Sequence, residues 1–247
     1  MKAMIFAAGL GTRLRPITDT MPKALVPVCG KPLLFHTICK LRDAGYDDIV
    51  VNVHHFPEQI RQYLQENDFG VKISISDESE QLLETGGGIL AARPMLTGDT
   101  PFLVHNVDIV SNLDLARLRA ATRQEDLATL VVSARDTRRY LLFDDDMRLV
   151  GWTDTSTGEV RSPFPDLDPS ACRRYAFSGI HSIGPEVFGA MDALGFAGRF
   201  PIMDFYLKAC AEYSIRGYLA PDLRMVDVGK IDTLPEVERI CATLLKA

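Results

Sequence analysis

Short apolar runs alternate with helical patterns through the first half of the chain, and this alternation constrains the fold most. Residues 3–8 form an apolar run, and residues 32–44 place apolar side chains at helical spacing. Strands that alternate with helices form mostly parallel sheets with helices on both faces. We therefore expect an α/β fold of this kind. Further strands are expected at 48–53, 71–76, 102–105 and 128–134, and further helices at 57–67, 87–96 and 113–122.

The second half of the chain does not continue this alternation of strands and helices. Residues 140–143 and 148–152, joined by three aspartates, predict a small β-hairpin, and the polar segment 153–171 predicts an excursion over the surface. No linker-like stretch separates the halves, so we expect a single domain over residues 1–247, with halves at about 1–134 and 135–247. The remaining expected elements are strands at 175–183, 215–219 and 224–228 and helices at 186–194, 202–211 and 233–245.

Charge, hydropathy and cysteine content exclude several classes of protein. The chain has 27 Lys and Arg against 33 Asp and Glu, a net charge of −6, which argues against a nucleic-acid-binding surface. No apolar run approaches the roughly 18 residues of a membrane span, so we expect no membrane partner. The five cysteines are an odd number without a C-x-x-C pair, which predicts reduced thiols in a cytoplasmic protein rather than disulfides or a zinc site.

The segment after the first expected strand carries the clearest chemical signal. It reads Ala8-Gly9-Leu10-Gly11-Thr12-Arg13-Leu14-Arg15, with Lys23 a few residues later. A glycine turn lets backbone N–H groups approach a phosphate, and the cations favour the same ligand; a plain tight turn with solvated cations is the alternative. Leu14 stands where a dinucleotide fingerprint needs its third glycine. Lys31 is followed by proline rather than the serine or threonine of a P-loop.

Five motifs in this order resemble those of the sugar-1-phosphate nucleotidylyltransferases. The run from Gly9 to Thr18, followed by Pro22-Lys23-Ala24-Leu25, is similar to the signature of that family. The other similar segments are 83–89, 105–108, 177–180 and 226–229. The resemblance implies a glycosyltransferase-A-like, Rossmann-like fold. Its pattern is most similar to the short branch that includes N-acetylmuramate-1-phosphate uridylyltransferases and small mannose- or heptose-1-phosphate guanylyltransferases.

The resemblance implies that residues 1–134 bind a nucleoside triphosphate and residues 135–247 a sugar 1-phosphate. The products are a nucleotide-diphosphate sugar and pyrophosphate. Because the attacking phosphate is already an anion, this reaction needs positioning, cations and metal rather than a general base. UTP with N-acetylmuramate 1-phosphate or a similar amino-sugar phosphate is the first choice. The alternatives are GTP with mannose or heptose 1-phosphate, a cytidylyltransferase acting on a phosphorylated alcohol, and a non-catalytic nucleotide-sugar sensor or regulatory subunit.

The resemblance also assigns site residues. Arg13 and Lys23 are the expected catalytic cations, and Lys23, Ser178 and Gly179 are expected to bind the sugar phosphate. Asp108 and Asp227 are expected to bind Mg²⁺, a cation that prefers oxygen ligands. Glu84 could equally be a carboxylate at a helix start. The expected nucleotide-binding residues are Ala8, Gly9, Gly11, Thr12, Arg13, Glu84, Gly86, Gly87, Gly88 and Asn106.

One departure from the family pattern concerns the sugar phosphate. Many larger relatives carry a Glu-Lys-Pro motif there, whereas residues 151–154 of this chain read Gly-Trp-Thr-Asp. Arg173, Arg174, Arg199 or Lys230 could replace the missing lysine. We expect a monomer or a small homo-oligomer.

Overall fold

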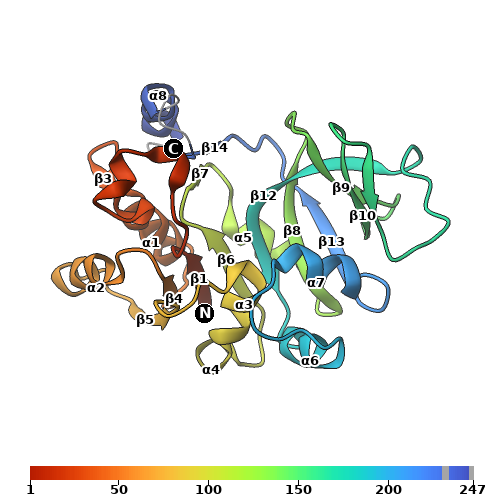
Figure 1. Ribbon diagram of the computed structural model, residues 1–247, viewed down its shortest axis with the longest axis horizontal. Helices are drawn as coiled ribbons and strands as arrows, with labels where there is room; N and C mark the ends of the chain where they lie inside the picture. Colours follow the sequence, from red (N-terminus) through yellow and green to blue (C-terminus); the bar gives the residue numbers. More distant parts are fainter. Residues whose placement is uncertain (230–233, 245–247) are drawn as a thin grey trace.

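The computed structural model describes residues 1–229 and 234–244 of the chain. The described residues form one ten-stranded sheet and two two-stranded sheets (Figure 1). The large sheet contains β1 (Lys2–Phe6), β4 (Asp48–Val53), β5 (Lys72–Asp77), β6 (Phe102–Asn106), β8 (Asp126–Ser133), β9 (Arg139–Phe143), β10 (Leu149–Asp154), β11 (Glu159–Arg161), β12 (Arg173–Ile183) and β13 (Ser214–Leu219). The small sheets pair β2 (Pro27–Val28) with β3 (Lys31–Pro32), and β7 (Ile109–Ser111) with β14 (Met225–Asp227).

The order of the strands confirms the expected fold class. Four neighbouring strands, β5, β4, β1 and β6, run parallel, and β12 joins β6 in the opposite direction. The predicted hairpin is β9 and β10, which lies at the opposite end of the molecule from α2 (Figure 1). The surface excursion 153–171 is more ordered than expected. Its first residues extend β10, and β11 pairs with that strand.

Helices cover both faces of the sheet, as predicted. Along β1, Ala3 and Ile5 belong to one hydrophobic cluster and Met4 to the other, because successive side chains of a strand point to opposite faces. The first cluster contains side chains of α1 (Leu33–Asp43), α2 (Pro57–Glu66), α5 (Leu115–Ala121) and α8 (Leu234–Leu244). The second contains side chains of α3 (Glu84–Ala91), α4 (Arg93–Leu96), α6 (Val187–Ala193) and α7 (Ile202–Ala209).

Several element boundaries differ from the prediction. The strand expected over 3–8 ends at Phe6, so Ala7 and Ala8 belong to the following loop. The helix expected over 87–96 begins at Glu84 and is divided at Ala92 into α3 and α4. The strand β7 was not predicted. It pairs with β14 and so brings two distant parts of the chain together.

None of the helices in the described ranges is long and apolar enough to cross a membrane.

Candidate active site

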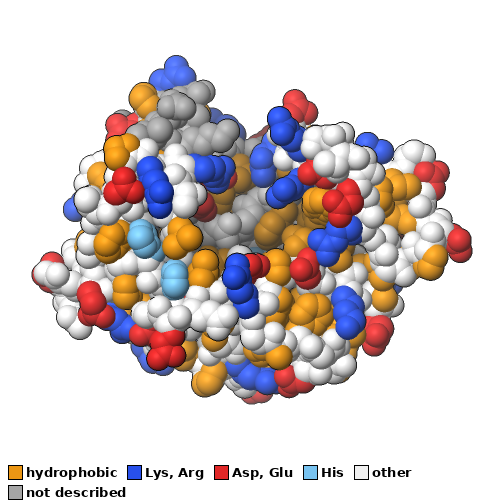
Figure 2. All heavy atoms as spheres, viewed as in Figure 1, with side chains coloured by type: hydrophobic (Ala, Val, Ile, Leu, Met, Phe, Trp, Pro, Cys, Tyr) orange, Lys and Arg blue, Asp and Glu red, His pale blue; other side chains and the backbone are white. Residues whose placement is uncertain are grey.

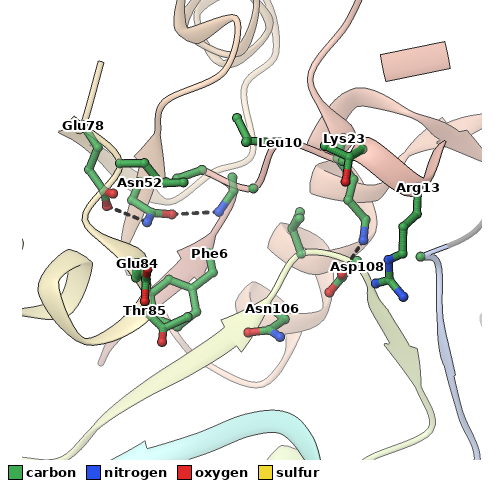
Figure 3. Close-up of a pocket in the computed structure, with 18 residues that line it drawn as sticks. Phe6, Leu10, Arg13, Lys23, Asn52, Glu78, Glu84, Thr85, Asn106 and Asp108 are labelled. Atoms are coloured by element: carbon green, nitrogen blue, oxygen red, sulfur yellow. Dashed lines mark hydrogen bonds and ion pairs between the residues drawn. The ribbon is translucent and has the colours of Figure 1, made fainter. Parts of the chain in front are cut away.

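A cavity of about 540 Å³ opens where β1 and β6 end, and it gathers most of the expected residues (Figure 3). A central hollow is visible on the molecular surface, with Lys and Arg side chains along its margin (Figure 2). The expected residues that line the cavity are Ala8, Gly9, Gly11, Thr12, Arg13, Lys23, Glu84, Asn106 and Asp108. The sequence did not indicate two further polar lining residues, Asn52 and Glu78, and Thr85 lines the cavity from within the similar segment 83–89.

The loop that leaves β1 is shaped by one glycine in particular. Gly11 has a φ of +63°, and a Cβ at this position would lie 2.8 Å from the Cγ2 atom of Thr18. The Thr18 hydroxyl donates a hydrogen bond of 2.8 Å to the Gly11 carbonyl oxygen. Gly9, by contrast, has open space beside its Cα atom. The loop is therefore anchored at Gly11 and open at Gly9, where a phosphate can approach the backbone.

Lys23 and Arg13 both lie beside Asp108 (Figure 3). Lys23 is only 8% exposed, and its ammonium group donates to the Asp108 carboxylate. A Cβ built at Gly229 would lie 2.9 Å from the Arg13 guanidinium and 2.7 Å from the Asp227 Oδ1 atom. Gly229 therefore lies close to both side chains and leaves room for them. The site holds two cations and two carboxylates close together.

The two carboxylates are adjacent because β7 pairs with β14. Asp227 lies opposite Ile109, and the Val228 N–H donates a 2.9 Å hydrogen bond to the Asp108 carbonyl oxygen. Partial burial raises the pKa of Asp227, and the negative charge of Asp108 raises that pKa further. Lys23, Arg13 and Arg135 act in the opposite direction.

A divalent cation fits this pair of carboxylates, because it would relieve their mutual repulsion. Within the described residues, however, no group of three or more His, Cys, Asp or Glu side chains could hold a metal ion alone. A metal bound here would need phosphate or water oxygens to complete its ligand set.

A buried hydrogen-bond network connects α3 to the loop that follows β1. We call this loop, residues 7–11, the phosphate loop because its open backbone at Gly9 suits a phosphate. Asn52 accepts a 2.7 Å bond from the Ala7 N–H and donates a 2.7 Å bond to Glu78 (Figure 3). The second carboxylate oxygen of Glu78 accepts a 3.0 Å bond from the Leu83 N–H, just before α3. Asn52 and Glu78 are each only 2% exposed. The one available signal was the polar Asn52 inside the otherwise apolar run of β4.

The three glycines of α3 are placed differently from the expectation. Gly86, Gly87 and Gly88 are buried and are absent from the cavity lining. A Cβ at Gly86 would clash with the Phe200 ring, and one at Gly87 would lie 2.3 Å from the Gly198 carbonyl oxygen. The N–H groups of Gly86 and Gly87 donate to the Phe200 carbonyl oxygen. In this structure, the glycines allow α3 to pack closely rather than forming the cavity wall.

The start of α3 does line the cavity. Glu84 is the first residue of the helix, in agreement with the helix-start alternative, and its carboxylate pairs with the Arg199 guanidinium at 2.7 Å. The Thr85 hydroxyl accepts a 2.8 Å hydrogen bond from the Ile202 N–H. The cavity wall is therefore held to the loop before α7.

Ser178 and Gly179 lie in β12 at an irregularity in its pairing with β8. A Cβ at Gly179, whose φ is +71°, would lie 2.8 Å from the Asn106 side-chain nitrogen. Ser178 is buried, and its hydroxyl has no hydrogen-bond partner among the described residues. The structure thus places Gly179 against Asn106 and neither residue in the cavity lining, and their contact with a sugar phosphate stays a prediction.

The expected replacements for the missing lysine have other partners. Arg199 pairs with Glu84, Arg173 with Asp145, and Arg174 donates to the Pro169 carbonyl oxygen. Lys230 lies outside the described residues. Arg135 was not predicted from the sequence; it follows β8 and donates a 3.0 Å hydrogen bond to the Phe177 carbonyl oxygen. Its charge also lowers the pKa of Asp227, so it lies on the carboxylate side of the site.

Known proteins resemble this chain in sequence. The N-acetylmuramate alpha-1-phosphate uridylyltransferase of Neisseria meningitidis is 48% identical to this chain over 241 residues. The match covers 97% of this chain and 98% of that protein. The Caulobacter vibrioides protein of the same name is 34% identical, and the match covers 92% of this chain and 91% of that protein. The mannose-1-phosphate guanyltransferase of Neurospora crassa is 43% identical over 136 residues, 54% of this chain and 37% of that protein.

Solved structures share the fold. The inositol-1-phosphate CTP transferase of T. maritima superposes with a TM-score of 0.77 at 15% identity, covering 100% of this chain and 96% of that one. A putative glucose-1-phosphate thymidylyltransferase of Bacillus anthracis superposes with a TM-score of 0.76 at 21% identity. That match covers 98% of this chain and 95% of the other. The sequence model described as "Nucleotidyl transferase" matches residues 2–143, which include the phosphate loop, Lys23 and Asp108. The chain belongs to the nucleotidyl transferase family.

Proposed function

We propose that the chain transfers UMP from UTP to N-acetylmuramate 1-phosphate and releases pyrophosphate. The observation that carries this proposal is the 48% identity to a protein of that activity over nearly the whole of both chains. The cavity supports the same reaction class, because it combines an open glycine loop, two cations and Asp108, and Asp227 lies beside Asp108 just outside the lining. Such a site can position two anions and stabilise charge on a phosphoryl group.

In this proposal, each charged residue has a separate task. The Lys23 ammonium group, already between the phosphate loop and Asp108, would move onto the α-phosphate and the incoming sugar phosphate. The exposed Arg13 guanidinium would hold the leaving phosphates at the other side of Asp108. Ala8, Gly9, Gly11 and Thr12 would contact the triphosphate through the loop. Asn106 would approach the nucleotide from the end of β6.

Mg²⁺ is the proposed cofactor, with Asp108 and Asp227 as its protein ligands. When bound, the ion would supply positive charge that polarises the α-phosphate and neutralises the leaving group. The raised pKa of Asp227 supports this assignment, because a carboxylate crowded by another negative charge gains most from a divalent cation. Proton transfer is not required of any side chain, since the sugar phosphate attacks as an anion.

GTP with mannose or heptose 1-phosphate is the second candidate. The likeness to the Neurospora crassa guanyltransferase supports it, but that likeness extends over only 136 residues. A non-catalytic nucleotide-sugar sensor is the alternative from another class. The joint presence of Arg13, Lys23, Asp108 and Asp227 in one site argues against it, because binding alone does not require this arrangement.

The test is pyrophosphate release by the purified chain, with UTP, GTP, CTP, ATP and dTTP each combined with sugar 1-phosphates that include N-acetylmuramate, glucosamine, mannose and heptose forms. We expect release that requires both substrates and Mg²⁺ and is fastest with UTP and N-acetylmuramate 1-phosphate. Release that is fastest with GTP and a neutral sugar phosphate would favour the second candidate. Nucleotide binding without release in any combination would favour the sensor.

A further inference from the structure

A second cavity, of about 790 Å³, lies between the end of β8, the strand β14 and the helix α8. Its polar lining is rich in arginine, with Arg135 after β8 and Arg224 before β14. Ser133 also lines it, is 9% exposed, and has a hydroxyl without a hydrogen-bond partner among the described residues. The lining residues are Ser133, Ala134, Arg135, Leu223, Arg224, Met225, Arg239, Ile240, Thr243 and Leu244.

This second cavity lies against β14, the strand that carries Asp227. Met225, which lines it, and Asp227 are two positions apart on β14, so their side chains point to the same face of that strand. Arg135 connects the two places as well. Its guanidinium bonds to the Phe177 carbonyl oxygen, and its charge reaches Asp227. A sugar 1-phosphate bound at a metal ion on Asp227 can therefore extend toward Arg135.

Arg135 and Arg224 have no salt bridge among the described residues. Across the part of the chain that the structure describes, no carboxylate lies within salt-bridge distance of Arg135 or Arg224, and both residues are exposed. Other exposed arginines, such as Arg173 and Arg199, do have carboxylate partners. An exposed guanidinium with no carboxylate beside it is available to bind the planar carboxylate of a ligand.

We propose that Arg135, in this cavity next to the catalytic carboxylates, binds the carboxylate of an acidic sugar 1-phosphate and so selects it over neutral sugar 1-phosphates. The inference rests on the proposed function, because N-acetylmuramate differs from N-acetylglucosamine by an ether-linked carboxylic acid. Arg224 contributes a second positive charge to the same cavity. The 1-phosphate of the sugar is the other anion that Arg135 could bind, and the experiment distinguishes the two.

The experiment compares Arg135→Gln with the wild-type chain on two substrates, N-acetylmuramate 1-phosphate and N-acetylglucosamine 1-phosphate, each with saturating UTP. Glutamine keeps a donor for the Phe177 carbonyl but removes the charge. The matched control is Arg123→Gln, an exposed arginine just before the opposite end of β8. Thermal melting checks that both variants remain folded.

We expect Arg135→Gln to lower kcat/KM for the muramate compound about 10- to 100-fold, the usual range for a lost charge-assisted hydrogen bond, and mainly through KM. The glucosamine compound should change by less than about 2-fold, because it offers Arg135 no carboxylate. Arg123→Gln should change neither. If the glucosamine compound turns over too slowly, its inhibition constant against the muramate compound gives the same comparison.

Three outcomes would overturn the inference. Equal losses with both sugars would mean that Arg135 binds the shared 1-phosphate. No loss with either sugar would mean that it binds neither anion. Equal kcat/KM values of the wild-type chain for both sugars would mean that it does not select a carboxylate. The proposed function fails separately, and the inference with it, if the wild-type chain releases no pyrophosphate with the muramate compound.

Discussion

The two sides of the cleft are constructed in different ways. On the proposed nucleotide side, Lys23, Asn52 and Glu78 are almost completely buried, and the last two are joined in one hydrogen-bond network with the backbone of the phosphate loop and the residue before α3. On the proposed sugar side, Arg135 and Arg224 are exposed, and of the two only the side chain of Arg135 has a hydrogen bond to the described protein. The first side is held in shape by the core. The second is formed by surface side chains.

Of the residues on the two sides, Lys23, Asn52, Glu78 and Arg135 lie inside the range that the family model matches, and Arg224 lies outside it. The family model covers residues 2–143, and a guanyltransferase that uses mannose 1-phosphate matches over 136 residues. The uridylyltransferase named for N-acetylmuramate matches over 241 residues. A buried network tolerates few substitutions, because each one leaves an unsatisfied group. Exposed side chains tolerate many substitutions. A change in which sugar is bound is therefore easier to make than a change in how the triphosphate is bound.

The largest expected effect is that of Lys23→Ala. Loss of the buried ammonium group should lower kcat for pyrophosphate release about 100- to 1,000-fold, the usual cost of removing one preorganised donor from a charged transition state. Because Lys23 would contact the α-phosphate and the 1-phosphate that all these sugars share, the loss should be equal for every sugar 1-phosphate used. Lys72→Ala, at an exposed lysine paired with Asp48, is the matched control and should be near wild type. A loss that depends on the sugar would break the comparison.

Glu78→Gln tests the buried network. The new amide N–H₂ would face the Leu83 N–H, and two donors cannot form a hydrogen bond with each other. The free energy of unfolding should therefore fall by about 1–3 kcal/mol. The KM for the triphosphate should rise as well, since the phosphate loop is held through Asn52. Denaturant unfolding and initial rates measure the two effects. A raised KM for the sugar phosphate alone, with unchanged stability, would contradict the division between the two sides.

Gly87→Ala tests the packing of α3. The added methyl would lie 2.3 Å from the Gly198 carbonyl oxygen, so unfolding should become easier by about 1–3 kcal/mol, as for other overpacked sites. Gly189→Ala is the matched control. Gly189 lies inside α6 with open space around it, and alanine there should stabilise the helix by about 0.5–1 kcal/mol. Calorimetric unfolding of the two variants gives the comparison, and unchanged stability of Gly87→Ala would contradict the packing role.

The smallest expected effect concerns the stability of Asp227→Asn. The pKa of Asp227 is raised by folding, so the native state binds this proton more tightly than the unfolded state. Stability is therefore lost as pH rises from the carboxyl's ordinary value of about 4 through its raised value in the native state. Asparagine does not titrate, so Asp227→Asn does not lose stability over this pH range.

At pH 7 and without metal, Asp227→Asn should melt slightly above the wild-type chain, by about 1–2 °C. The difference should vanish at pH 3, where the wild-type carboxyl is protonated in both states. Asp99→Asn, at an exposed carboxylate just before the start of β6, is the control. A higher melting temperature of the wild-type chain at pH 7 would show that Asp227 is stabilised rather than crowded by its neighbours.

The sequence predicted the elements whose patterns are local. Alternation of apolar residues predicted the strands and helices on both faces, and the glycine loop after β1 predicted the lining residues Ala8, Gly9, Gly11, Thr12 and Arg13. Boundaries failed where tertiary contacts decide them. The strand β1 ends early because the Ala7 N–H bonds to Asn52 rather than to a neighbouring strand.

Two kinds of site residue were not predicted from the sequence. Glu78 is one carboxylate in a polar stretch, and only the folded chain shows that it is buried and joined to Asn52. Arg135 is one of several arginines in the second half, and only its position after β8 separates it from Arg173 and Arg174. The glycines of α3 were predicted as binding residues, but their pattern does not distinguish close packing from a ligand contact.

The pairing of β7 with β14 also has a consequence for synthesis of the protein. Ile109 and Asp227 are opposite each other in this ladder although they are far apart in the sequence, a long-range contact of the kind that forms slowly. A chain emerging from the ribosome can complete the parallel strands β1, β4, β5 and β6 well before β14 is available. The nascent protein therefore lacks Asp227, the second proposed metal ligand, until residue 227 has been translated, and the proposed chemistry cannot begin before then.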